Sequence, residues 1–83
     1  MTGKQIVLEI LAWLGIGSIL AAFAVVSFGL IAPDGFIYPA LNGFGAILLI
    51  ITSWHKQFIQ LVVLNVVWLL IAALAITRFL VVA

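Results

Sequence analysis

The chain contains no cysteine and very little charge, and each absence restricts what the protein can be. Without cysteine it can form no disulfide, no thiol nucleophile and no thiolate metal site. Only 6% of its 83 residues are charged, whereas soluble domains carry about 25%, so a polar surface in water is excluded. Three Lys or Arg residues against two Asp or Glu leave a formal net charge of +1 and no basic excess for nucleic acid.

Hydrophobic residues make up 69% of the sequence and give a mean hydropathy of +1.55, so a lipid bilayer must replace water as the solvent. Apolar segments at about 6–31, 37–54 and 58–80 predict three transmembrane helices. The first is too long for the apolar part of a signal peptide, so we expect it to be retained. Strands are not expected, because three of them could not close a barrel in lipid. The predicted fold class is an all-α membrane protein, one domain over residues 1–83, with three transmembrane helices in a small bundle.

The second segment combines one amide with three small residues: Asn42, Gly43, Gly45 and Ala46. A polar side chain inside an apolar helix is costly in lipid unless it finds a partner. Small residues let neighbouring helices approach closely. A helix with several small side chains and one polar side chain is therefore expected to lie inside the bundle, enclosed by the other two.

The first and third segments carry stripes of small or polar residues at helical spacing. In the first segment the stripe is Gly15, Ser18 and Ala22, with Gly17 and Ala21 as a neighbouring small pair. In the third segment it is Asn65, Trp68, Ala72 and Ala75.

Two interpretations of the third stripe are open. We favour a packing seam in which Asn65 bonds across to Asn42 or to a backbone carbonyl and the alanines permit close approach. The alternative is a binding pocket, in which Asn42 and Asn65 offer hydrogen bonds and Trp68 a stacking surface.

Two short polar breaks separate the segments. Residues 33–35 read Pro-Asp-Gly, which is typical of a turn, and residues 54–57 read Trp-His-Lys-Gln, with an aromatic side chain suited to a membrane interface. The expected interfacial anchors are Lys4, Glu9, Trp54, His55, Lys56 and Arg78. Three crossings put two lysines on the amino-terminal side and one arginine on the other, so the positive-inside rule favours a cytoplasmic amino terminus.

Glu9 is the one anchor that suggests chemistry. A carboxylate inside a membrane helix can relay protons or cations. We favour a position at the level of the headgroups, because Glu9 is only about one turn from the interface. Its expected partners there are Lys4, Lys56 or His55. One histidine and one carboxylate are too few for a metal site, and no nucleophile stands in a pattern with a base, so we predict no metal, no cofactor and no enzymatic activity.

A further set of residues carries a family resemblance. It comprises Tyr38, the Leu41-Asn42 pair, Gly45-Ala46-Ile47-Leu48-Leu49, Ser53, the stretch from Asn65 to Trp68, and Ile71-Ala72. With these residues, from about Trp13 to Ile76, the chain resembles a family of small bacterial membrane proteins known by a locus-tag name, the CBU-type membrane domain. That family has no assigned activity. The resemblance implies three spanning helices and a role as a small accessory protein.

A looser likeness is to bacterial half-transporters of the sugar-exporting type, which have about this length and three helices and dimerise around a central pocket. Gly45-Ala46-Ile47-Leu48 and Leu64-Asn65-Val66-Val67 stand at comparable positions, and the likeness implies that Asn65 lines the pocket. The Pro-Gln motif of that family's first helix is absent, because the first segment here contains no proline. Alternating access would therefore lack its usual hinge.

Two functional hypotheses follow. The first is a non-catalytic protein of the bacterial inner membrane, an accessory or assembly subunit that packs against a larger membrane protein complex or self-associates, with a respiratory or photosynthetic complex as a conjecture. No small-molecule substrate is expected in that case. The alternative is a small dimeric transporter or channel with a polar pocket at Asn42, Asn65 and Trp68.

Overall fold

Three α-helices joined by two short connections make up the computed structural model, which describes residues 2–82. The helices are α1 (Gly3–Ser27), α2 (Ile37–His55) and α3 (Ile59–Val82). Each is long and apolar enough to cross a membrane, and no strand occurs between residues 2 and 82. The predicted all-α fold with three transmembrane helices is confirmed, and the protein is a multi-pass membrane protein.

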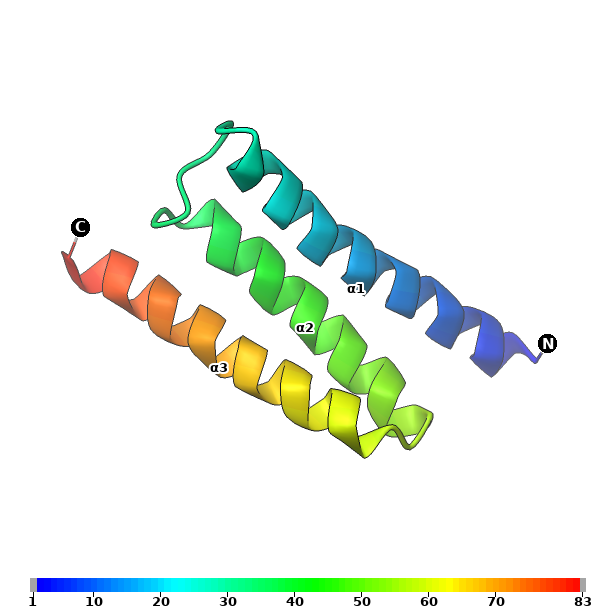
Figure 1. Ribbon diagram of the computed structural model, residues 1–83. Helices are drawn as coiled ribbons and strands as arrows, with labels where there is room; N and C mark the ends of the chain where they lie inside the picture. Colours follow the sequence, from blue (N-terminus) through cyan, green and yellow to red (C-terminus); the bar gives the residue numbers. More distant parts are fainter. Residues whose placement is uncertain (1, 83) are drawn as a thin grey trace.

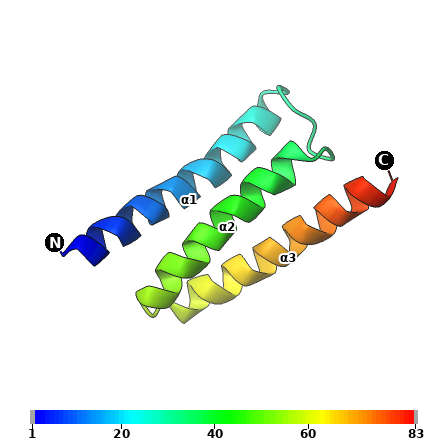
Figure 2. The same ribbon diagram turned by 180° about the vertical axis from the view of Figure 1, so that it is seen from behind.

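The helix α2 lies between α1 and α3, antiparallel to both, and the outer two helices do not touch each other (Figure 1). The view from behind shows the same order, with the start of α1 and the α2–α3 connection at one end and the end of α3 at the other (Figure 2). Seven residues of α2 are buried, against two of α1 and three of α3. The bundle is an open layer in which α2 alone has a helix on each side.

The first helix begins three residues earlier than the predicted segment 6–31. Thr2 and Gln5 form a capping box, in which the Gln5 backbone N–H donates to Thr2 Oγ1 at 3.2 Å and the Thr2 N–H donates to Gln5 Oε1 at 2.9 Å. These two bonds satisfy N–H groups that the helix itself cannot. The helix therefore starts in the polar residues that precede the apolar segment, where hydropathy alone placed no helix.

The first helix also ends earlier than predicted, at Ser27, because Gly29 takes a left-handed backbone conformation with φ of 73°. The Leu30 N–H donates to the Val25 carbonyl at 2.8 Å, and the Gly29 N–H to the Val26 carbonyl at 3.0 Å. This pair of bonds closes the helix end as a Schellman motif. Residues 28–31 are apolar, so hydropathy extended the predicted segment beyond the turn.

The end of α2 uses the same motif without a glycine. Gln57 has φ of 60°, its N–H donates to the Trp54 carbonyl at 3.1 Å, and the Phe58 N–H donates to the Ser53 carbonyl at 3.0 Å. A left-handed conformation is unfavourable for a residue with a side chain. The short α2–α3 connection thus contains one strained position.

Candidate functional site

The helices α1 and α2 approach each other closely at Gly15 and Gly45. A Cβ atom added to Gly45 would lie 2.7 Å from both the Gly15 carbonyl oxygen and Ile19 Cγ1, so the two backbones meet with no room for a side chain. One turn away, the Ser18 hydroxyl donates to the Leu41 carbonyl of α2 at 2.8 Å. The stripe of Gly15, Ser18 and Ala22 therefore faces α2, whereas the neighbouring pair Gly17 and Ala21 is exposed.

Small residues also line the contact between α2 and α3, but less tightly. A Cβ on Gly43 would lie 3.5 Å from Ala72 Cβ, an ordinary van der Waals distance, and Ala46 is fully buried. At the far end of this contact, the rings of Phe36 and Phe79 lie 6.1 Å apart, tilted by 49°.

The two membrane amides are buried, at 6% exposed for Asn42 and 5% for Asn65, but each bonds within its own helix. Asn42 Nδ2 donates to the Tyr38 carbonyl at 3.1 Å, and Asn65 Nδ2 donates to the Leu61 carbonyl at 2.8 Å. The expected bond across to the other asparagine is not formed, and the backbone carbonyl that Asn65 finds belongs to α3. A carbonyl one turn earlier is always within reach of such a side chain, so no partner helix is required.

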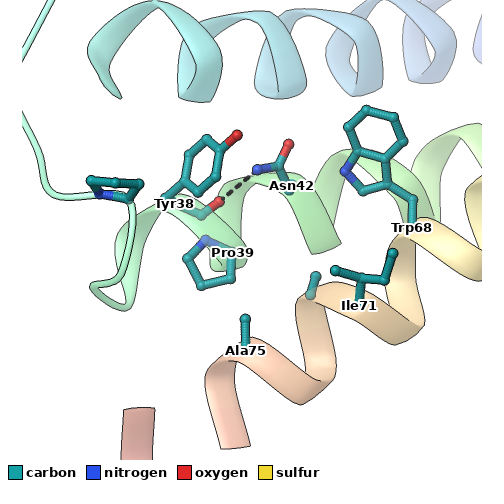
Figure 3. A pocket seen from close by; sticks show the side chains of 8 residues that line it. Tyr38, Pro39, Asn42, Trp68, Ile71 and Ala75 are labelled. Atoms are coloured by element: carbon teal, nitrogen blue, oxygen red, sulfur yellow. Dashed lines mark hydrogen bonds between the residues drawn. The ribbon is translucent and has the colours of Figure 1, made fainter. Parts of the chain in front are cut away.

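A hollow of about 370 Å³ opens between α2 and α3 on the side of Asn42 (Figure 3). It is lined by Tyr38, Pro39 and Asn42 from α2 and by Trp68, Ala72 and Ala75 from α3. Asn65 does not line it. The structure thus brings together two of the three residues that the pocket interpretation required. Tyr38 was not predicted as a pocket residue. Its position one turn before Asn42, on the same helical face, could have indicated that it lines the hollow.

A second hollow, of about 650 Å³, adjoins the first at the carboxyl-terminal end of α3. Pro33 and Ala75 line both. Asp34, from the α1–α2 connection, and Arg78, from α3, line the second hollow only. The sequence assigned these two charges to the same side of the membrane but did not indicate that they share a cavity.

The opposite end of the molecule holds Glu9. Its Oε2 lies 3.6 Å from Lys56 Nζ, with both side chains 44% exposed, and its Oε1 accepts a hydrogen bond from Trp13 Nε1 at 3.1 Å. Lys56 is one of the three partners that we expected for Glu9, and the position of Glu9 at the level of the headgroups stays a prediction. Trp13 was not among the predicted site residues, although its spacing of four from Glu9 places both on one helical face.

The remaining predicted anchors, Lys4, Trp54, His55 and Arg78, are exposed near the helix ends. Within residues 2–82, no group of three or more His, Asp or Glu side chains is placed to hold a metal ion.

A model of a protein family matches residues 8–83, which is nearly the whole chain. The chain belongs to the CBU-type family of small membrane proteins. The match covers most of α1 and all of α2 and α3 of this CBU-type protein, and it extends beyond the stretch of about 13–76 that carried the resemblance. No curated protein and no solved structure matches the chain.

Proposed function

We propose that this protein is a non-catalytic subunit of the bacterial inner membrane that acts through helix–helix contacts, as an accessory or assembly factor for a larger membrane protein complex. The observation that carries the proposal is the open layer, in which α1 and α3 each have one helix neighbour and do not meet. Such a layer leaves the outer sides of two helices free for a partner.

The sides of α1 are not equivalent. Gly15 and Ala22 are buried against α2, whereas Gly17 and Ala21 are exposed on another side of the same helix. A Cβ atom on Gly17 would meet nothing within 4 Å. A small pair at this spacing permits close approach of a second helix. Neither α2 nor α3 packs against Gly17 and Ala21. This supports α1 as the side that a partner contacts.

Co-purification tests the proposal. Native membranes solubilised in a mild detergent should yield the tagged chain in a complex much larger than 8.9 kDa. Gly17→Leu should release the chain from that complex, because the added side chain separates the two helices while the fold has room for it. Ala73→Leu, at an exposed position of α3, is the matched control and should remain in the complex. A wild-type chain that migrates alone would contradict the accessory role.

Orientation forms part of the proposal. Lys4 and Lys56 lie at one end of the molecule and Arg78 at the other, so the positive-inside rule favours a cytoplasmic amino terminus. The chain has no cysteine of its own, which makes single introduced cysteines clean reporters. In spheroplasts a membrane-impermeant maleimide should label Asp34→Cys and leave Gly3→Cys, which keeps both lysines, unlabelled.

A dimeric transporter or channel is the second candidate, and the hollow beside Asn42 and Trp68 is the observation that favours it. Flux of sugars or ions into liposomes tests this role. Asn42→Ala should abolish flux while leaving assembly intact, and Asn65→Ala should preserve it, because Asn65 does not line the hollow. If the wild-type protein gives no flux, the transporter role is contradicted and only the accessory role remains.

A further inference from the structure

The two hollows on α2 and α3 form one path from the membrane interface inward. They share Pro33 and Ala75, so the larger hollow at the helix ends continues into the smaller one beside Trp68. Arg78 and Trp68 stand ten residues apart on α3, which corresponds to about 15 Å along the helix axis. This depth is half of a hydrocarbon core of about 30 Å. The path therefore has the length of a single lipid leaflet.

The outer end of this path carries both signs of charge. Asp34 and Arg78 line the same hollow but form no ion pair with each other. Within the described residues, the ion pair that does form joins Glu9 and Lys56. The inner end is largely apolar, lined by Ile71, Ala72 and the Trp68 ring. A molecule that fits must present a positive and a negative group side by side at the interface and an apolar chain below them.

We propose that the joined hollows bind one phospholipid with a primary-amine headgroup, of the phosphatidylethanolamine class. The Arg78 guanidinium donates hydrogen bonds to the lipid phosphate, a geometry that guanidinium groups match well. The lipid ammonium donates to the Asp34 carboxylate. One acyl chain descends past Ala75 toward Trp68. A choline headgroup has no N–H to donate and a glycerol headgroup has no positive charge, so neither satisfies Asp34.

Native mass spectrometry of the purified protein tests the site. The protein is equilibrated in detergent with equal amounts of phosphatidylethanolamine, phosphatidylcholine and phosphatidylglycerol that carry the same acyl chains. The wild type should retain one phosphatidylethanolamine preferentially. Asp34→Asn should remove the preference for ethanolamine over choline. Arg78→Gln should lower retention of all three lipids about tenfold, because hydrogen bonds to charged groups exceed about 1.4 kcal/mol.

Blocking the path with a larger side chain is the second arm of the test. Ala75→Phe places a ring where the two hollows join and should abolish retention, and because Ala75 is exposed the helix contacts remain. Ala73→Phe, exposed on α3 and outside both hollows, is the control and should retain lipid as the wild type does.

Three results would overturn the site. Equal retention of the three lipids by the wild type and all variants would identify annular lipid only. Displacement by glycerophosphoethanolamine, which has the headgroup without acyl chains, at the same concentration as the lipid would refute the apolar path. Loss of a dimer in Ala75→Phe with unchanged lipid retention would assign the hollow to a second copy of the chain.

Discussion

Replacing Gly45 by alanine should separate α1 from α2 while leaving both helices formed. The new Cβ would lie 2.7 Å from the Gly15 carbonyl oxygen and from Ile19 Cγ1, closer than such atoms approach in proteins. One of these contacts is backbone, so a change of side-chain rotamer cannot relieve the clash and the helices must move apart. The movement would also weaken the hydrogen bond from Ser18 to the Leu41 carbonyl, which lies one turn away at 2.8 Å.

The size of this effect follows from the overpacked contact. Overpacking of a close contact costs about 1–3 kcal/mol. The higher helix propensity of alanine does not offset this cost, because α2 stays helical whether or not α1 packs against it. We therefore expect Gly45→Ala to destabilise the association of α1 with α2 by about 1–3 kcal/mol.

Helix content is the wrong observable for this variant, since separated helices persist in micelles. Dyes on Lys4→Cys and His55→Cys, both exposed at the same end of the molecule, report the distance between α1 and α2 by energy transfer. Titration with SDS in mixed micelles then gives the midpoint of helix separation. The Gly45→Ala midpoint should fall at a lower SDS fraction than that of the unsubstituted chain.

Gly43→Ala is the matched control, two residues away on the same helix. Its Cβ would lie 3.5 Å from Ala72 Cβ, an ordinary contact, so this variant should stay within about 0.5 kcal/mol of the wild type. If Gly45→Ala and Gly43→Ala shift the midpoint equally, the close approach of α1 and α2 is not what holds them together, and the reasoning fails.

Three further changes probe other contacts. Ser18→Ala removes the hydroxyl that bonds α1 to α2 and should cost about 0.6–1 kcal/mol of helix association in the same titration, whereas Thr77→Ala, whose bond stays within α3, should not move the midpoint. Gln57→Gly relieves a residue with φ of 60° and should raise stability by about 1 kcal/mol; a loss of stability would show that the side chain compensates for its backbone. Lys56→Gln removes the ion pair with Glu9, but both side chains are 44% exposed, so the loss should stay below about 1 kcal/mol and vanish in high salt, and a larger loss that survives salt would contradict an exposed pair.

The helix ends show why local signals succeed in part. The turn after α1 depends on Gly29 with its positive φ, but the residues around it are apolar, and hydropathy ran the predicted segment past it to residue 31. The capping box at Thr2 and Gln5 is a recognisable pattern, yet it lies in the polar stretch that hydropathy excluded. Hydropathy therefore predicted that each helix exists, whereas the residues at which a helix begins and ends are set by hydrogen bonds at the helix termini.

The candidate site was predictable only as a set of residues. Asn42, Trp68 and Ala72 were expected to matter, and they do line one hollow. Asn65 has the same chemistry, an equally buried side chain and the same bond within its own helix, but it does not line that hollow. Nothing in residue type distinguishes the two amides.

The amino-acid sequence alone determined that this is a membrane protein with three spanning helices and that the thin, polar α2 lies between the others. Hydropathy and residue size are local properties, so they can be read before the chain is folded. Only the tertiary structure decided that Gly15 contacts α2 while Gly17 does not, and that Asp34 and Arg78 share a hollow. A spanning helix is apolar on every side, so its pattern does not reveal its rotation, and the packing against α2 sets which face is used.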